Sequence, residues 1–183
     1  MTILIFGAMG TIGRKLKAAF PDSIGFDRVT GADVMADLAS IDYDAPEIRA
    51  AFEKADGVIH VATSAGTNDP DPGHWAAVIG TARLMATCDR YNIRRVIIPS
   101  SDWADPKTRW ATNPENVYGH SKRVIEAMAH MYNLGHPDRH CVALRIGWVP
   151  RDPAEVATAD QWLQANYWDD ARLIAQMTAA LGD

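Results

Sequence analysis

The sequence predicts an α/β protein built around a doubly wound parallel sheet. Short apolar runs rich in Val and Ile alternate along the chain with longer segments of helical periodicity, and most of the Pro, Asp and Asn residues fall in loops that follow those runs. Strands that alternate with helices pair in parallel through right-handed crossovers, which place helices on both faces of the sheet.

Each predicted element follows from its own stretch of pattern. Strands are expected at residues 3–6, 23–26, 33–35, 57–61, 95–99 and 142–146. Helices are expected at residues 11–20, 46–54, 75–91 and 118–134, with a last one around residues 171–181. The main loops, at residues 67–73, 102–116 and 150–160, follow strand ends. In an open α/β sheet, this edge is where ligands bind.

The length of the chain indicates one globular domain, and its charge limits the partners it can bind. The chain has 183 residues, of which 48% are hydrophobic, so it can bury one sizeable core. The 18 Lys and Arg residues against 23 Asp and Glu give a net charge of -5, which argues against nucleic acid or an anionic membrane as a partner. The N-terminal residues carry no basic leader or membrane-spanning apolar run, so we expect a cytoplasmic protein.

A glycine-rich turn follows the first predicted strand and opens the first helix. Its sequence is Gly7-Ala8-Met9-Gly10-Thr11-Ile12-Gly13. Such spacing lets bare backbone approach a pyrophosphate at the helix N-terminus, because a Cβ would occupy the place of the phosphate. Asp27 falls at the end of the second strand, 20 residues after Gly7, where a carboxylate can accept both hydroxyls of an adenosine ribose. The pattern predicts a Rossmann dinucleotide site; a tight turn that merely uses three glycines is the alternative.

The charge of Asp27 favours NAD as the cofactor. A carboxylate at this position repels the 2′-phosphate of NADP, although the adjacent Arg28 could partly offset that repulsion. The predicted contacts in this part of the site are Gly7, Met9, Gly10, Thr11, Ile12, Gly13, Asp27 and Arg28.

A tyrosine and a lysine begin the fourth predicted helix, in Tyr118-Gly119-His120-Ser121-Lys122. A spacing of four places the phenol and the ammonium on one face, one turn apart. The ammonium and a positive nicotinamide ring both favour phenolate, so Tyr118 can accept a substrate hydroxyl proton while hydride leaves for the cofactor. Ser100-Ser101 ends a strand, where a hydroxyl can hold the substrate oxygen beside the phenol. The pattern predicts that Tyr118 and Lys122 act together in proton transfer; a solvated helix pair is the alternative.

With these motifs the chain resembles the extended short-chain dehydrogenase/reductases, the NAD-dependent epimerase/dehydratase superfamily. The matching segments are Gly7-x-x-Gly10-x-x-Gly13, Asp27, Asp37-Leu38, His60-Val61-Ala62, Gly80-Thr81, Ser100-Ser101, Tyr118-Gly119-x-Ser121-Lys122 and Leu144-Arg145-Ile146-Gly147. The Arg145-Ile146-Gly147 ending and the later Trp162…Asp169-Asp170 segment are most similar to uronate dehydrogenases. The resemblance implies that Asp37 and Leu38 flank the adenine and that Val61 and Ala62 lie along the cofactor. It also implies that Ser101, Tyr118 and Lys122 are the catalytic residues, of which Tyr118 and Lys122 also contact the cofactor.

The chain also departs from the pattern of this superfamily. Ala77 stands where members usually carry an asparagine that completes a proton relay. Trp148 replaces a small polar residue, and no arginine stands where uronate dehydrogenases place the one that meets the sugar carboxylate, only Arg151 nearby. We expect residues 1–183 to form a single NAD-binding Rossmann domain with the strand order 3-2-1-4-5-6. Residues 148–183 are expected to form its shortened, substrate-side C-terminal region.

These observations predict an NAD-dependent oxidoreductase that moves hydride between the nicotinamide and a hydroxyl or carbonyl of a small, sugar-like or neutral polar substrate. Two alternatives stay open. One is a sugar epimerase or dehydratase dependent on NAD or NADP, which uses the same hydride step internally. The other is a catalytically weak dinucleotide-binding sensor or scaffold. Cys88 and Cys141 are expected as packed, reduced thiols, and the histidine spacings predict no metal site.

The sequence contains two sets of apolar residues that can contact either a ligand or other protein surfaces. Five tryptophans either border the substrate or fill a shortened C-terminal region or a subunit interface: Trp103, Trp110, Trp148, Trp162 and Trp168. On the helix at residues 75–91, a stripe of Leu84, Cys88 and Tyr91 runs beside Val78, Ala82 and Met85. The next long helix carries Val124, Ala127, Met128 and Met131. We expect these two helices to form a four-helix interface in a homodimer.

Overall fold

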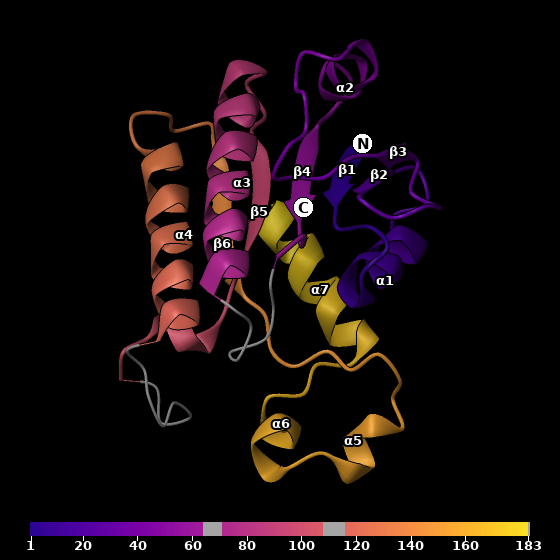
Figure 1. The fold of residues 1–183 in the computed structure, drawn as a ribbon, viewed down its shortest axis with the longest axis vertical. Helices are drawn as coiled ribbons and strands as arrows, with labels where there is room; N and C mark the ends of the chain where they lie inside the picture. The colour runs from indigo at the N-terminus through magenta and orange to yellow at the C-terminus, as the bar shows by residue number, and fades with distance from the viewer. Residues whose placement is uncertain (64–70, 108–115, 183) are drawn as a thin grey trace.

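A computed structural model describes residues 1–63, 71–107 and 116–182 of the chain. Six parallel strands form one sheet in the order β3-β2-β1-β4-β5-β6 (Figure 1), which confirms the predicted fold class and strand order. The strands are β1 (Ile3–Phe6), β2 (Ile24–Asp27), β3 (Val34–Met35), β4 (Gly57–His60), β5 (Arg95–Ser100) and β6 (His140–Arg145).

Helices cover both faces of the sheet. They are α1 (Thr11–Ala19), α2 (Pro46–Phe52), α3 (Asp71–Arg90), α4 (Val117–Asn133), α5 (Glu155–Thr158), α6 (Gln161–Ala165) and α7 (Asp170–Leu181), with a 3-10 turn η1 (Asp102–Ala104) after β5. Two of the predicted elements start at least two residues earlier than expected. Strand β6 begins at His140 because its N–H donates to the carbonyl of Arg94, and α3 begins at Asp71 because its Pro72 lies in the first turn, where proline is tolerated.

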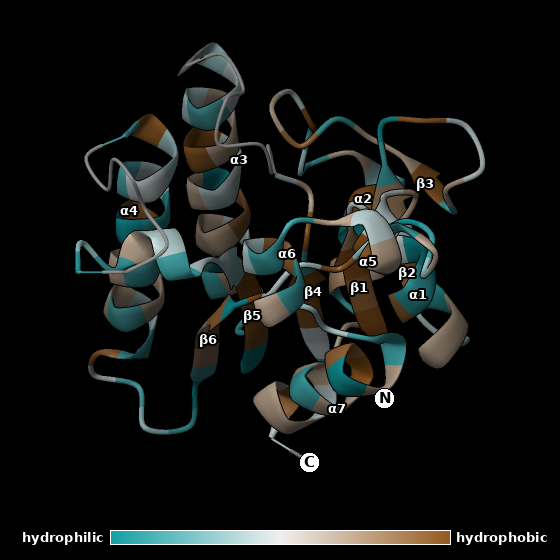
Figure 2. Cartoon of the chain, turned by 90° about the horizontal axis from the view of Figure 1, so that it is seen from below, coloured by the Kyte–Doolittle hydropathy of each residue, from teal (hydrophilic) through white to brown (hydrophobic). Residues whose placement is uncertain are grey.

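Alternate strand residues supply two separate cores, as the period of two in a strand requires. Leu4 and Phe6 of β1 pack with α2, α3 and α4 on one face, whereas Ile3 and Ile5 pack with α1 and α7 on the other. Figure 2 shows the brown, apolar strands between helices of mixed colour. Burial on both faces explains why these strands are continuous apolar runs rather than alternating ones.

The C-terminal segment divides into two parts. Trp148 donates its backbone N–H to the carbonyl of Asn166 at 2.8 Å, and Trp168 donates to the carbonyl of Trp148 at 2.8 Å, which closes the base of an excursion. This excursion carries α5 and α6, which lie below the carboxyl edge of the sheet in Figure 1 and in front of the strands in Figure 2. Helix α7 then returns to the sheet and belongs to the core.

The prediction that Leu84 and Cys88 of α3 lie in a subunit interface is wrong. Leu84 and Cys88 have no exposed area and pack in the core of their own chain, because α3 contacts both the sheet and α4. The exposed apolar residues on these helices are Trp75, Ile79, Val117, Val124 and Met131. Cys88 and Cys141 are buried free thiols, as expected. Within the described ranges, no helix is long and apolar enough to cross a membrane.

Candidate active site

A cleft of about 610 Å³ opens at the carboxyl edge of the sheet. The turn after β1, the ends of β4 and β5, the start of α4 and the segment after β6 form its walls. It brings together these predicted residues: Gly7, Gly10, Thr11, Ile12, Gly13, Val61, Ser101, Tyr118 and Lys122. The remaining predicted residues lie outside its lining: Met9, Asp27, Arg28, Asp37, Leu38 and Ala62.

The three glycines of the turn serve different purposes. Gly7 has φ +87°, and a Cβ there would lie 2.6 Å from the backbone nitrogen of Ala62. A Cβ on Gly13 would collide with the carbonyl oxygen of Gly7. Only Gly10 has open space beyond that oxygen while it lines the cleft. The expectation that a Cβ would take the place of a phosphate therefore applies to Gly10 alone; the other two permit close packing of the helix and strands.

The N-terminus of α1 is suited to an anion. Its N-cap is Gly10, which offers no side-chain cap, and the first turn carries no acidic residue. The backbone N–H groups and the helix dipole at this end therefore meet the cleft without a protein anion of their own. Such a cradle fits the pyrophosphate of a dinucleotide.

Asp27 is tied to the same turn. Its Oδ2 accepts the backbone N–H of Met9 at 2.8 Å, and its Oδ1 accepts the N–H of Val29 at 3.3 Å. The half-buried carboxylate thus stands beside the glycine turn, while Arg28 is exposed. Asp37 accepts the N–H of Ala39 and so closes a turn.

Tyr118 and Lys122 share one face of α4, at the end of the helix that meets the cleft. Lys122 is 1% exposed, and its Nζ donates to Thr63 Oγ1 at 3.2 Å and to the carbonyl of Pro99 at 3.4 Å. The same nitrogen lies 5.2 Å from the centre of the buried Tyr118 ring. Burial lowers the pKa of Lys122 to about 8. Asn116 caps this helix by accepting the N–H of Gly119 at 2.7 Å.

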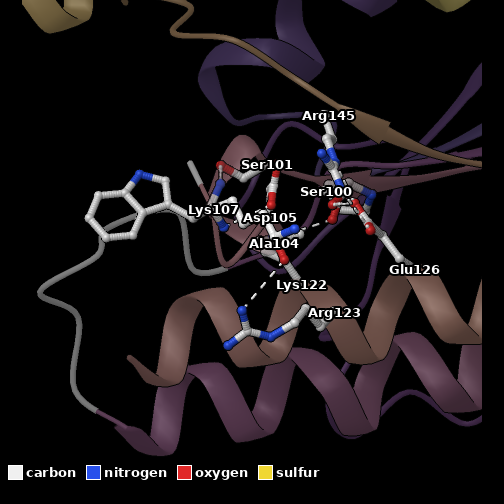
Figure 3. A network of polar contacts seen from close by, with 11 residues as sticks. Ser100, Ser101, Ala104, Asp105, Lys107, Lys122, Arg123, Glu126 and Arg145 are labelled. Carbon is white, nitrogen blue, oxygen red and sulfur yellow. Dashed lines mark hydrogen bonds and ion pairs between the residues drawn. The ribbon is translucent and has the colours of Figure 1, made fainter. Parts of the chain in front are cut away.

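The two serines at the end of β5 have different surroundings. The Ser101 Oγ accepts the N–H of Trp103 at 3.4 Å, so this side chain caps η1 beside the cleft. Ser100 Oγ donates to Glu126 at 2.7 Å, and Glu126 also accepts two bonds from Arg145, at 2.7 and 3.0 Å (Figure 3). This bidentate network ties β5, α4 and β6 together behind the cleft.

The hydrogen bonds of this network lower the pKa of Glu126. Burial alone would raise the pKa, but the hydrogen bonds from Arg145 and Ser100 outweigh it and hold the pKa below its usual value. Sequence reasoning found Arg145 within a motif and missed Glu126. The available signal was its position four residues after Lys122, on the same face of a helix.

A second buried network joins β4 to α3. His60 Nδ1 accepts the N–H of Ala62 at 3.2 Å, so its Nε2 carries the proton and donates to Thr81 Oγ1 at 3.0 Å. The Thr81 hydroxyl then donates to the carbonyl of Ala77 at 2.7 Å. Burial lowers the pKa of His60 to about 3, so the ring stays neutral and fixes the end of the strand. Sequence reasoning assigned neither this network nor Thr63.

Aromatic residues form the outer part of the cleft. Trp103, Trp148 and Trp162 line it, while Trp168 packs in the core near α7. Trp110 lies outside the described residues. Among the lining residues that the structure describes, Lys122 carries the one positive charge and Asp102 the one negative charge. Arg151 lines a separate hollow with Arg14 and Lys15.

A parallel sheet in this order, with a glycine turn after β1 and a tyrosine and lysine at the same cleft, defines a Rossmann-like dinucleotide-binding domain. The model of the NAD dependent epimerase/dehydratase family matches residues 3–149, so the chain belongs to that family. This confirms the resemblance seen in the sequence and agrees with NAD as the expected cofactor. No curated protein matches the sequence.

Solved structures share the fold. A mutated uronate dehydrogenase has a TM-score of 0.79 and 22% identity, over 99% of this chain and 69% of its own. A GalE-like L-threonine dehydrogenase from Cupriavidus necator has a TM-score of 0.69 and 22% identity, over 81% of this chain and 56% of its own. A UDP-galactose 4-epimerase has a TM-score of 0.66 and 23% identity, over 83% of this chain and 58% of its own. The chain thus spans little more than half of the latter two.

Proposed function

We propose that the protein is an NAD-dependent oxidoreductase that interconverts a hydroxyl and a carbonyl on a small neutral substrate. The observation that carries this proposal is the placement of the buried Lys122 over the ring of Tyr118, in the cleft that also holds the glycine turn. When bound, NAD supplies the nicotinamide carbon that accepts or gives the hydride.

The chain supplies the groups that hold such a cofactor. The N-terminus of α1 and Gly10 receive the pyrophosphate, and Asp27 accepts the hydroxyls of the adenosine ribose. The carboxylate already orients the turn through Met9, so turn and ribose site form one unit. The proposed contacts are Gly7, Met9, Gly10, Thr11, Ile12, Gly13, Asp27, Arg28, Asp37, Leu38, Val61, Ala62, Tyr118 and Lys122.

Proton transfer falls to Tyr118 in this proposal. Its phenolate accepts the substrate hydroxyl proton during oxidation and returns it during reduction. The Lys122 ammonium favours the phenolate because the two charges are opposite, and a pKa of about 8 keeps most of that ammonium charged at neutral pH. Ser101, buried at the cleft wall, holds the substrate oxygen.

The lining of the outer cleft supports a neutral substrate. The acid Asp102 and the aromatic Trp103, Trp148 and Trp162 lie there, and Arg151 lies in a different hollow. A carboxylate left without a bidentate partner loses interactions of about 1.5–3 kcal/mol each. Weak activity on hexuronates is therefore expected, whatever the likeness to a uronate dehydrogenase.

A substrate panel tests the proposal. Neutral aldoses, cyclic alcohols and hexuronates are incubated with NAD⁺ and the purified protein, and the reduced-cofactor absorbance is followed. Turnover of a neutral compound that Tyr118→Phe abolishes supports the proposal, and Tyr91→Phe, outside the cleft, serves as the control. NAD binding by calorimetry without turnover of any compound would favour a sensor or scaffold. Clear preference for hexuronates would overturn the substrate class.

The family name also supports an epimerase or dehydratase as a second candidate. Such an enzyme uses the same Tyr118 and Lys122 but returns the hydride to its substrate, so no reduced cofactor accumulates. Inversion of a sugar stereocentre without net cofactor reduction, followed by proton NMR, separates this candidate from a dehydrogenase.

A homodimer is the proposed assembly. The support is the exposed apolar row on two neighbouring helices, with Trp75 and Ile79 on α3 and Val124 and Met131 on α4. Apolar residues at this density on adjacent helices favour burial against a second copy.

A further inference from the structure

We propose that His74 is a positioning residue for Tyr118 and receives its proton between turnovers. This inference rests on the proposed function, since it concerns the same tyrosine. His74 lies in the first turn of α3 and is 1% exposed. Its ring centre lies 5.5 Å from that of Tyr118, with an angle of 62° between the ring planes. The two rings therefore pack edge to face across the boundary between α3 and α4.

The polar atoms of His74 set this residue apart from an ordinary core side chain. Within the described part of the chain, neither ring nitrogen has a hydrogen-bond partner, and both are shielded from solvent. A buried donor or acceptor without a partner is unfavourable, and such groups in native proteins are few. Phenylalanine would fill a similar space with no polar atom to satisfy. His60 gives the contrast, since both of its nitrogens are engaged.

His74 lies one helical turn before Ala77 on α3. Ala77 offers only a methyl group, and its carbonyl already accepts the Thr81 hydroxyl. The imidazole of His74 thus places hydrogen-bonding atoms beside Tyr118 from the same helix and the preceding turn. Trp103 packs on the same tyrosine at 6.4 Å and 75°, so two rings hold the plane of the phenol.

The proton balance of the reaction gives His74 its role. In oxidation, the substrate O–H bond breaks and its proton forms an O–H bond with the Tyr118 phenolate, while the hydrogen on carbon leaves as hydride. That tyrosine must then lose its proton before the next turnover. Neither ring nitrogen of His74 bonds to the phenol directly, so we place the proton on one of them through a single bridging water, and from there it passes to bulk water. Imidazole suits this step because one of its ring nitrogens can accept a proton while the other can donate one.

Three variants test the proposal: His74→Phe keeps a ring against Tyr118, His74→Gln restores a polar group, and His130→Phe changes an exposed histidine of α4 as the matched control. We expect His74→Phe to melt at the wild-type temperature or above, because it removes unsatisfied polar atoms. With a substrate found by the panel above, its kcat should fall about tenfold or more, with KM and the NADH dissociation constant within about twofold. His74→Gln should recover part of the loss, and His130→Phe should match wild type.

The two measurements overturn the proposal in different ways. A melting temperature several degrees lower in His74→Phe means that the nitrogens support the fold, and a kcat within about twofold of wild type means that the ring only packs. Failure of this proposal leaves the proposed function intact if Tyr118→Phe still abolishes turnover in the same assay. If the proposed function itself is wrong, the wild-type protein turns over no compound of the panel.

Discussion

The Nζ of Lys122 lies 5.2 Å from the centre of the Tyr118 ring, on the face of α4 that meets the carboxyl edge of the sheet. The lysine is 1% exposed, and its hydrogen-bond acceptors include one hydroxyl and one carbonyl, both uncharged. A charged group in such surroundings loses hydration that neutral acceptors restore only in part. The chain therefore keeps a destabilising charge beside the Tyr118 ring, where the proposed mechanism needs a positive charge.

Replacing this lysine should stabilise the fold in a pH-dependent way. The pKa of Lys122 falls from 10.5 to about 8 on folding, so below pH 8 both folded and unfolded chains hold the proton and the full penalty applies. Between pH 8 and 10.5 the folded chain has released it, and the penalty shrinks as pH rises. Lys122→Met should raise the free energy of unfolding by about 1–3 kcal/mol at pH 7, with a smaller difference at pH 10.

Urea unfolding at both pH values measures this effect, with the exposed Lys54→Met as the control. A variant less stable than wild type at pH 7, or one whose gain does not change with pH, contradicts the assigned surroundings of Lys122.

The choice of cofactor should depend on the charge of Asp27. Because this carboxylate accepts the Met9 N–H, Asp27→Asn keeps an acceptor for the turn and removes only the charge. Wild type should bind NADH more tightly than NADPH, since a 2′-phosphate meets the carboxylate, and the variant should narrow the gap about tenfold. Calorimetry with both cofactors provides the measurement. Equal affinities in wild type would assign control of the ribose site to Arg28.

The network around Glu126 should stabilise the fold at pH values at which the Glu126 carboxylate is ionised. The pKa of Glu126 is lower in the folded chain than its ordinary value of 4.5, so its contribution is present above about pH 4.5 and is lost as pH falls through the folded pKa. Glu126→Gln should cost about 1 kcal/mol at pH 7, a modest value because solvent screens the partly exposed Arg145. The difference from wild type should shrink below pH 4. Glu53→Gln changes an exposed glutamate and serves as the control. A difference in the free energy of unfolding between wild type and Glu126→Gln that stays the same from pH 7 to below pH 4 would count against the network.

Assembly should depend on the exposed apolar row of α3 and α4. Leu84 cannot report on an interface because it is buried within its own chain, whereas Ile79 is 54% and Met131 68% exposed. The double variant Ile79→Glu and Met131→Glu should keep the melting behaviour of the fold and halve the mass in light scattering at micromolar concentration. A wild-type monomer, or a dimer that both changes leave intact, would refute this surface.

Periodic patterns predicted the strands and helices well, since each is a local property of the sequence. The alternation of apolar runs and helical segments predicted a parallel sheet, and the Rossmann pattern of the glycine turn added the strand order. The glycine turn, Tyr118 and Lys122 all line the cleft. Helical periodicity could not show which side of α3 packs inward, because α3 contacts both the sheet and α4. Leu84 and Cys88 were therefore assigned to the wrong surface.

The missed features are contacts between residues far apart in the chain. His60 bonds to Thr81, 21 residues later, and Ser100 bonds to Glu126, 26 residues later. No spacing rule within one helix or strand predicts such pairs, because they depend on how separate elements dock. The glycines show the same limit: their pattern was recognised, but the reason for Gly13 is the nearby carbonyl of Gly7, which only the packed turn reveals.

The most direct test of the account is a single-turnover measurement of nicotinamide reduction at saturating NAD⁺. Wild type and Tyr118→Phe are compared with a substrate that the panel above identifies. If the tyrosine transfers the substrate proton, the variant should react about two to four orders of magnitude more slowly, with NAD⁺ affinity within about twofold of wild type. Tyr91→Phe should react like wild type. A Tyr118→Phe variant that reduces the nicotinamide at the wild-type rate would contradict the central claim.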